Sequence, residues 1–140
     1  MGRPVTYLDA SVIVPLFLPE PRSTEAESIV VRGDFVVSDL AVAEVSSAVS
    51  LAVRINRLPE PAARTALTTF DAWLAGHALK AETRGEDFSA ATVLIRNFQL
   101  GLRTPDALHI VVAKRLGATL ATFDARMAEA AKALGVGLVA

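Results

Sequence analysis

Four carboxylates, Asp9, Glu44, Asp106 and Asp124, stand out in this 140-residue sequence as candidates for a chemical role. Taken singly, each has an ordinary explanation, because acids are common at helix starts and on solvated surfaces. Several acids gathered in one place repel each other unless a divalent cation lies between them. Oxygen ligands without Cys or His suit Mg²⁺ or Mn²⁺ better than zinc. Such an ion would favour hydrolysis of a phosphodiester bond.

The positions of Asp9 and Asp124 depend on the predicted strands. Asp9 directly follows a β-prone run at residues 5–8. Asp124 follows a second run, residues 119–122, with one residue between, and opens the next helix. Ligands of mainly parallel sheets gather outside the carboxyl ends of the strands. We therefore expect Asp9 and Asp124 to lie at one edge of a sheet.

Asp106 and Glu44 belong to predicted helices. Thr104 is a candidate cap and Pro105 suits a first turn, so Asp106 falls where an acid favours the helix dipole anyway. Glu44 is more informative, because Leu40, Ala48 and Leu51 place it on an apolar helical stripe. A carboxylate buried there needs a partner or a cation. The alternative is a partly exposed position at the edge of that stripe.

The remaining pattern alternates short strands with helices, which predicts an α/β fold with a mainly parallel sheet. Ser11 and Ser38 are predicted to cap their helices, and Gly117 and Gly135 to end theirs. No internal repeat or long linker divides the chain, so we expect one domain over residues 1–140. The predicted strands are 5–8, 35–37, 78–81, 119–122 and 136–139, and the predicted helices are 11–18, 23–31, 39–56, 62–76, 88–100, 104–116 and 124–134.

Composition excludes several classes of protein. No apolar run approaches the length of a membrane span, and no secretory signal is visible. The chain has no Cys, which excludes a disulfide scaffold and fits a cytoplasmic location. Fourteen Lys and Arg stand against 15 Asp and Glu, and 11 of those cations are Arg. This Arg bias is compatible with binding RNA phosphates, although an ordinary solvated surface is the favoured explanation for any single Arg.

Four short motifs follow one another along the sequence: Tyr7-Leu8-Asp9-Ala10-Ser11, Ser38 with Ala43-Glu44-Val45, Arg103-Thr104-Pro105-Asp106-Ala107-Leu108-His109, and Ala121-Thr122-Phe123-Asp124. Through these motifs, in this order, the sequence resembles the PIN-domain ribonucleases, and among them the VapC-type toxins of bacterial toxin–antitoxin pairs. The resemblance covers nearly the whole chain, and all four acidic positions of the family pattern are filled.

The resemblance implies a three-layer α/β/α sandwich and an Mg²⁺-dependent endoribonuclease, with Mn²⁺ as a possible substitute. Asp9 and Asp106 would be the most direct metal ligands, and Glu44 and Asp124 would complete the acidic pocket directly or through water. It also implies that Ser11 and Thr122 hold the carboxylates or waters by hydrogen bonds, although Ser11 could equally be a plain helix cap. A homodimer, an RNA substrate and a VapB-like antitoxin laid across the active-site groove are implied as well.

Two further residues have competing interpretations. His109 lies one helical turn after Asp106 and could reach substrate or metal, but a hydrogen-bonded core histidine is the favoured interpretation. Trp73 shares a helix with Leu67, Phe70 and Leu74, which favours a place in the core or at a dimer surface over a platform for stacking bases.

Two rival functions stay open beside the nuclease. One is a phosphoryl-accepting α/β domain, but Asp9 lacks the second acid two residues on that dehalogenase-type domains carry, and no Lys ends a predicted strand as receiver domains need. The other is a non-catalytic PIN-fold module that only binds RNA or a partner, and the intact acid set argues against it.

Overall fold

A parallel sheet of four short strands forms the centre of the molecule in the computed structural model, which describes residues 5–31 and 33–139. The strands follow the order β3-β2-β1-β4, and each neighbouring pair is parallel. This arrangement confirms the predicted α/β class. The strands are β1 (Thr6–Leu8), β2 (Phe35–Ser38), β3 (Leu79–Ala81) and β4 (Thr119–Ala121).

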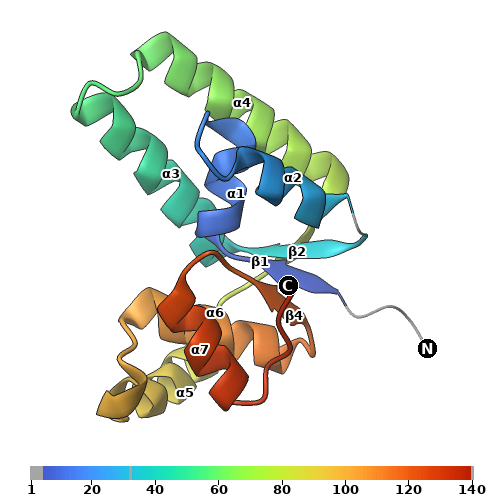
Figure 1. Cartoon of the computed structure of the whole chain (residues 1–140), viewed down its shortest axis with the longest axis vertical. Helices are drawn as coiled ribbons and strands as arrows, with labels where there is room; N and C mark the ends of the chain where they lie inside the picture. The colour runs from blue at the N-terminus through green and yellow to red at the C-terminus, as the bar shows by residue number, and fades with distance from the viewer. Residues whose placement is uncertain (1–4, 32, 140) are drawn as a thin grey trace.

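Helices cover both faces of this sheet, which confirms the predicted three-layer sandwich (Figure 1). The upper layer in Figure 1 consists of α1 (Ala10–Phe17), α2 (Ser23–Val30), α3 (Asp39–Arg54) and α4 (Glu60–His77). The lower layer consists of α5 (Gly85–Arg96), the short 3₁₀ helix η1 (Phe98–Leu100), α6 (Thr104–Arg115) and α7 (Ala125–Ala133). Within residues 5–31 and 33–139, no helix combines the length and the apolar character that crossing a bilayer requires.

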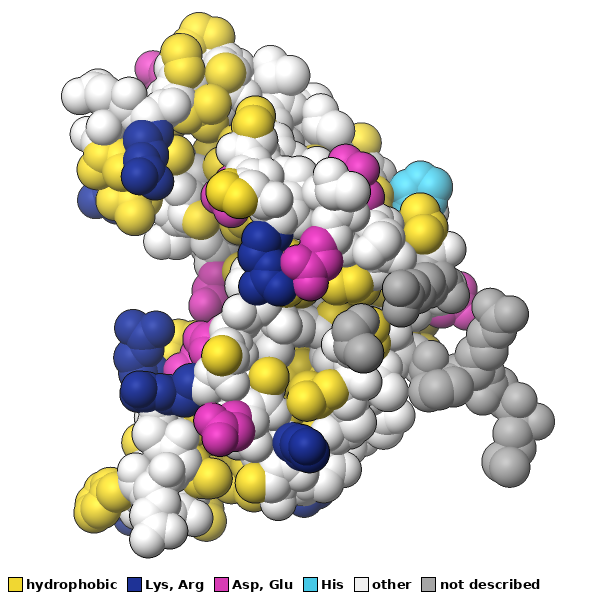
Figure 2. Space-filling view, in the orientation of Figure 1, with side chains coloured by type: hydrophobic (Ala, Val, Ile, Leu, Met, Phe, Trp, Pro, Cys, Tyr) yellow, Lys and Arg dark blue, Asp and Glu magenta, His cyan; other side chains and the backbone are white. Residues whose placement is uncertain are grey.

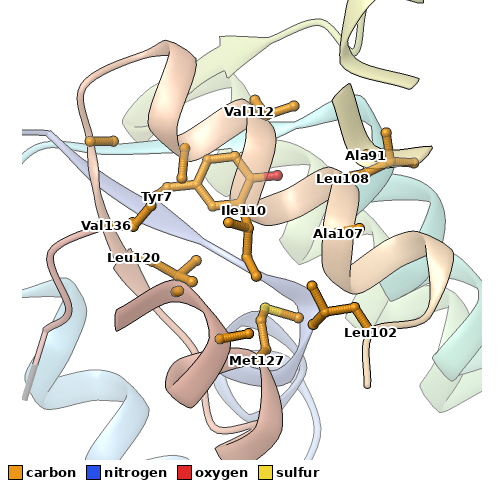
Figure 3. Packing of buried hydrophobic residues seen from close by; sticks show 14 of the residues in the cluster. Tyr7, Ala91, Leu102, Ala107, Leu108, Ile110, Val112, Leu120, Met127 and Val136 are labelled. Atoms are coloured by element: carbon orange, nitrogen blue, oxygen red, sulfur yellow. The ribbon is translucent and has the colours of Figure 1, made fainter. Parts of the chain in front are cut away.

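Alternating side chains of the strands feed two separate cores. Tyr7 packs with Leu120 and the inner faces of α6 and α7, where Ile110 and Met127 are buried (Figure 3). Leu8, the next residue along β1, points to the opposite core beneath α1, α3 and α4. This period of two explains how three-residue strands bury side chains on both faces.

Trp73 belongs to the upper core, as the sequence predicted. Its ring stacks on Phe35 with 5.1 Å between centroids, and the edge contact with Phe17 spans 5.4 Å. The side chain is half-buried in this aromatic cluster. These contacts support a packing role.

Most helix ends lie within a few residues of their predicted positions, but two predicted caps are wrong. Ser38 does cap α3, because its hydroxyl accepts the N–H of Ala41 at 3.1 Å. Ser11 does not cap α1, since the extended residue that precedes the helix is Asp9 and Ser11 lies in the first turn. Likewise α6 is preceded by Arg103, so Thr104 is its first helical residue.

Three other segments differ from the prediction. The predicted helix 88–100 is two pieces, because α5 ends at Arg96 and η1 stops at Gly101, whose φ of 63° is left-handed. The predicted strand 136–139 is reduced to one parallel bridge between Leu120 and Leu138. Helix α4 begins at Glu60, two residues before the predicted start at 62, because a proline at 61 is tolerated in a first helical turn.

Candidate functional site

Asp9 occupies the position that the sequence predicted, at the carboxyl end of the central strand β1. Its residue is only 3% exposed. Each carboxylate oxygen accepts a hydroxyl proton: Ser11 donates to Oδ1 at 2.6 Å and Thr122 donates to Oδ2 at 2.7 Å. Burial raises the pKa of Asp9, and these two hydrogen bonds, together with the nearby His109, oppose the shift. Asp9 is therefore a desolvated carboxylate held in a fixed orientation.

The same two hydroxyls connect Asp9 to the end of β4. Ser11 Oγ accepts the N–H of Phe123 at 2.8 Å, and Thr122 Oγ1 accepts the N–H of Asp124 at 3.1 Å. Asp124 is half-buried and precedes α7, where its own Oδ1 accepts the N–H of Met127 at 3.1 Å. The loop after β4 and the start of α1 thus form one hydrogen-bonded unit around Asp9.

Glu44 lies on α3 at the edge of the buried face, which matches the alternative of a partly exposed position. The buried stripe of α3 is formed by Ala41, Val45 and Val49, whereas the Glu44 side chain is 32% exposed. The partner that a carboxylate on this stripe needs comes from another element, because Glu44 Oε1 is hydrogen-bonded to Nε2 of His109 on α6. Residues distant in sequence supply that partner, so helix spacing could not reveal it.

Asp106 lies in the first turn of α6 and is 8% exposed. Its Oδ2 accepts the N–H of Arg103 at 3.2 Å, and the Arg103 guanidinium approaches the same oxygen at 3.9 Å. The side chain of Arg103 is 83% exposed, so solvent screens this ion pair. Asp106 therefore accepts a backbone hydrogen bond at the start of α6, as first-turn acids commonly do. Its carboxylate also lies one helical turn before His109.

An open groove of about 680 Å³ runs past this region and is lined by Ser11, Glu44 and Phe123, among others. Figure 2 shows the molecule hollowed between its upper and lower halves, with acidic side chains in the hollow and basic side chains along the lower rim. Arg22, which the sequence did not single out, also lines the groove. Its guanidinium lies 3.8 Å from the centroid of the Phe123 ring and pairs with Glu25 at 2.9 Å.

A metal ion fits this region by the chemistry of its donors. Asp9 and Asp106 are buried carboxylates, and oxygen donors of this kind suit Mg²⁺ and Mn²⁺. Over the described residues, no three Asp, Glu, His or Cys side chains lie close enough together to hold one ion. A site with two direct carboxylate ligands, completed through water by the other acids, stays a prediction.

His109 is a core histidine, as favoured from the sequence, and it is 1% exposed. Its Nδ1 forms a 2.6 Å hydrogen bond with the hydroxyl of Tyr7, while Nε2 contacts Glu44. Sequence reasoning missed this connection between a core residue and the acid set. A buried tyrosine on the first strand, which must bond its hydroxyl somewhere, was the one available signal.

Comparison with known proteins adds the family. Residues 6–133 match the PIN domain family. Ribonuclease VapC46 of Mycobacterium tuberculosis is 35% identical over 138 residues, which cover 96% of this chain and 95% of that protein. Ribonuclease VapC3 of Pyrobaculum aerophilum is 32% identical over 128 residues, covering 91% of this chain and 95% of that protein.

Solved structures share the fold at lower sequence identity. The toxin VapC20 of M. tuberculosis, described as cleaving the sarcin-ricin loop, superposes with a TM-score of 0.71 at 18% identity and covers 89% of this chain and 94% of its own. VapBC2 of Rickettsia felis, solved on a DNA fragment of its promoter, gives a TM-score of 0.69 at 14% identity, with coverage of 96% and 97%.

Proposed function

The chain belongs to the PIN-domain family and is of the VapC type, and from that premise we propose that it is a metal-dependent endoribonuclease acting as the toxin of a toxin–antitoxin pair. Two relatives at 35% and 32% identity carry the name ribonuclease, which supports the activity. The proposal includes one domain over residues 1–140, a location in the cytoplasm, and a homodimer bound by a VapB-like antitoxin.

One observation carries the metal dependence: Asp9 is a buried carboxylate without a cationic partner. Among residues 5–31 and 33–139, no Lys or Arg side chain forms an ion pair with it. A desolvated charge of this kind is costly unless a cation balances it. The groove lined by Ser11 and Glu44 would admit both a hydrated ion and an RNA strand.

The proposed roles are those that the family resemblance implies. Asp9 and Asp106 would hold Mg²⁺ or Mn²⁺ most directly, and Glu44 and Asp124 would complete the site directly or through water. When bound, the ion would supply the positive charge that activates water and stabilises the departing oxygen. Ser11 and Thr122 keep both oxygens of Asp9 in place by donating hydrogen bonds to them. The expected products carry a 5′-phosphate and a 3′-hydroxyl.

Growth inhibition tests the proposal as a whole. Induced expression of the chain in a bacterial host should arrest growth, and co-expression of the short reading frame expected beside its gene should restore growth. Asp9→Asn should be expressed in folded form without arresting growth, because the amide cannot replace the metal-binding charge. Full toxicity of Asp9→Asn would overturn the assignment of the site. A wild-type chain that causes no arrest, freed of any antitoxin, would count against the toxin function.

A further inference from the structure

A network of hydrogen bonds crosses the middle of the molecule and ends on Glu44. Ser38 Oγ and Tyr7 Oη lie 2.8 Å apart, and Tyr7 Oη lies 2.6 Å from Nδ1 of His109. The other ring nitrogen of His109, Nε2, contacts Oε1 of Glu44. These residues come from the end of β2, from β1, from α6 and from α3, so the hydrogen-bond network connects both helical layers through the sheet.

Every residue of this hydrogen-bond network except Glu44 is buried away from solvent. Tyr7 and Ser38 are 0% exposed and His109 is 1% exposed, whereas the side chain of Glu44 is 32% exposed and lines the groove. The hydrogen-bond network therefore lies inside the protein and reaches the groove only through the Glu44 carboxylate.

One set of proton directions gives every donor in this network an acceptor. Ser38 Oγ accepts the N–H of Ala41 at 3.1 Å and donates its own proton to Tyr7 Oη. Tyr7 then donates to Nδ1 of His109, which acts as the acceptor nitrogen of the ring. In this set the ring proton is on Nε2, which donates to Glu44.

We propose that His109, held by Tyr7 and Ser38, is a positioning residue that fixes the Glu44 carboxylate at the groove. The inference rests on the proposed metal-dependent function, because Glu44 is assigned there to the acid set. A glutamate on a helix surface otherwise samples several rotamers. A hydrogen-bond donor that is itself held in place, as His109 is by Tyr7, restricts the rotamers of Glu44. Residues that orient metal-site ligands from behind typically change metal affinity or activity by about 10–100-fold when they are replaced.

The proposal differs from the view that His109 only satisfies its own buried nitrogens. A purely structural histidine would affect stability whatever residue stood at position 44. A positioning residue acts through Glu44, so its effect on metal binding must vanish once the Glu44 carboxylate is gone. The two views therefore predict different double-mutant cycles.

The test is the affinity of the purified chain for Mn²⁺ alone, measured from the electron paramagnetic resonance signal of the free ion. We expect His109→Leu to weaken binding by about 10–100-fold. His109→Gln, which keeps a donor near Nε2, should restore most of the affinity. In the Glu44→Gln background, His109→Leu should change the affinity by less than about twofold. Val112→Ala, an equally buried change on α6, controls for general loosening of the core and should leave the affinity unchanged.

A second readout needs no metal. Long-range nitrogen–proton NMR spectra of the imidazole report which ring nitrogen carries the proton, and we expect Nε2–H with an unprotonated Nδ1. A neutral ring protonated on Nδ1 would contradict the proposed direction of hydrogen-bond donation along the network.

The outcomes separate this proposal from the proposed function. If the wild type binds Mn²⁺ and cleaves RNA but His109→Leu binds as tightly as the wild type, positioning is overturned and the nuclease stands. Equal loss from His109→Leu in both Glu44 backgrounds also overturns positioning. If the wild type binds Mn²⁺ with the predicted coupling but cuts no RNA, positioning stands and the nuclease fails. Absence of Mn²⁺ binding by the wild type overturns positioning, because Glu44 then has no ion to face.

Discussion

Replacing Thr122 by Val removes one hydroxyl from the buried carboxylate of Asp9 while nearly preserving the volume of the side chain. In the native structure Thr122 Oγ1 donates to Asp9 Oδ2 at 2.7 Å and accepts the N–H of Asp124 at 3.1 Å. A hydrogen bond to a charged group is worth about 1.5–3 kcal/mol. Because Asp9 is only 3% exposed, little water can replace the lost donor.

The expected loss converts into a melting temperature. A chain of 140 residues has an unfolding entropy of roughly 0.3 kcal/mol per kelvin, so the loss corresponds to a drop of about 5–10 °C. Thr122→Ser is the matched control, because it keeps the hydroxyl and should melt closer to the wild type than Thr122→Val does. Thermal unfolding in a chelator at pH 7, followed by circular dichroism, measures both variants.

The sign of the pH dependence follows from the pKa of Asp9. Burial raises this pKa in the folded state, so the fold holds the proton of Asp9 more tightly than the unfolded chain does. Stability therefore falls as pH rises from the ordinary value of 3.8 through the raised folded pKa. Thr122→Val removes a bond that favours the charged form, so its penalty is full above that pKa and shrinks as Asp9 becomes protonated. A melting temperature at pH 7 within about 2 °C of the wild type would refute this reasoning.

Three further outcomes are expected. Arg115→Met should destabilise the fold by about 3–5 kcal/mol in urea at pH 7, because it strands Asp87, which is 1% exposed and pairs with Arg115 at 2.9 Å. Arg115 lowers the pKa of Asp87, so the wild type should lose this stability as pH falls through the lowered value, and a variant equal to the wild type at pH 7 would contradict the pairing. Saturation with Mn²⁺ at about 100 times its Kd should stabilise the wild type by about 2.7 kcal/mol, or roughly 9 °C, and equal stabilisation of Asp9→Asn would contradict Asp9 as a ligand. Glu44→Gln should lower the rate of RNA cleavage strongly while changing the melting temperature little. A cleavage rate equal to that of the wild type would remove Glu44 from the site.

Local sequence signals predicted the layers of the fold well. The alternation of β-prone and helical segments indicated a parallel sheet, and the carboxyl ends of β1 and β4 placed Asp9 and Asp124 correctly. The hydroxyl of Ser38 caps α3 as its residue type suggests. These features depend on neighbours within a few residues, which a single sequence displays.

Features that depend on distant contacts could not be predicted in the same way. Ser11 looked like a helix cap, but its hydroxyl instead bonds Asp9 and the N–H of Phe123, which is distant in the chain. Glu44 appeared to lack a partner because its partner, His109, belongs to another helix 65 residues away. The strand predicted at 136–139 is only a bridge at Leu138, because among residues 5–31 and 33–139 two backbone hydrogen bonds with Leu120 are what joins it to the sheet.

We propose that the acids around Asp9 form the metal-dependent site of a ribonuclease. The most direct measurement incubates purified protein, freed of any antitoxin, with total RNA and Mg²⁺ or Mn²⁺ and maps the chemistry of the new ends. We expect defined cuts with 5′-phosphate and 3′-hydroxyl ends for the wild type, no cuts in a chelator, and no cuts by folded Asp106→Asn. Cleavage by Asp106→Asn at the wild-type rate, or intact RNA after incubation of the wild type with metal, would contradict this proposal.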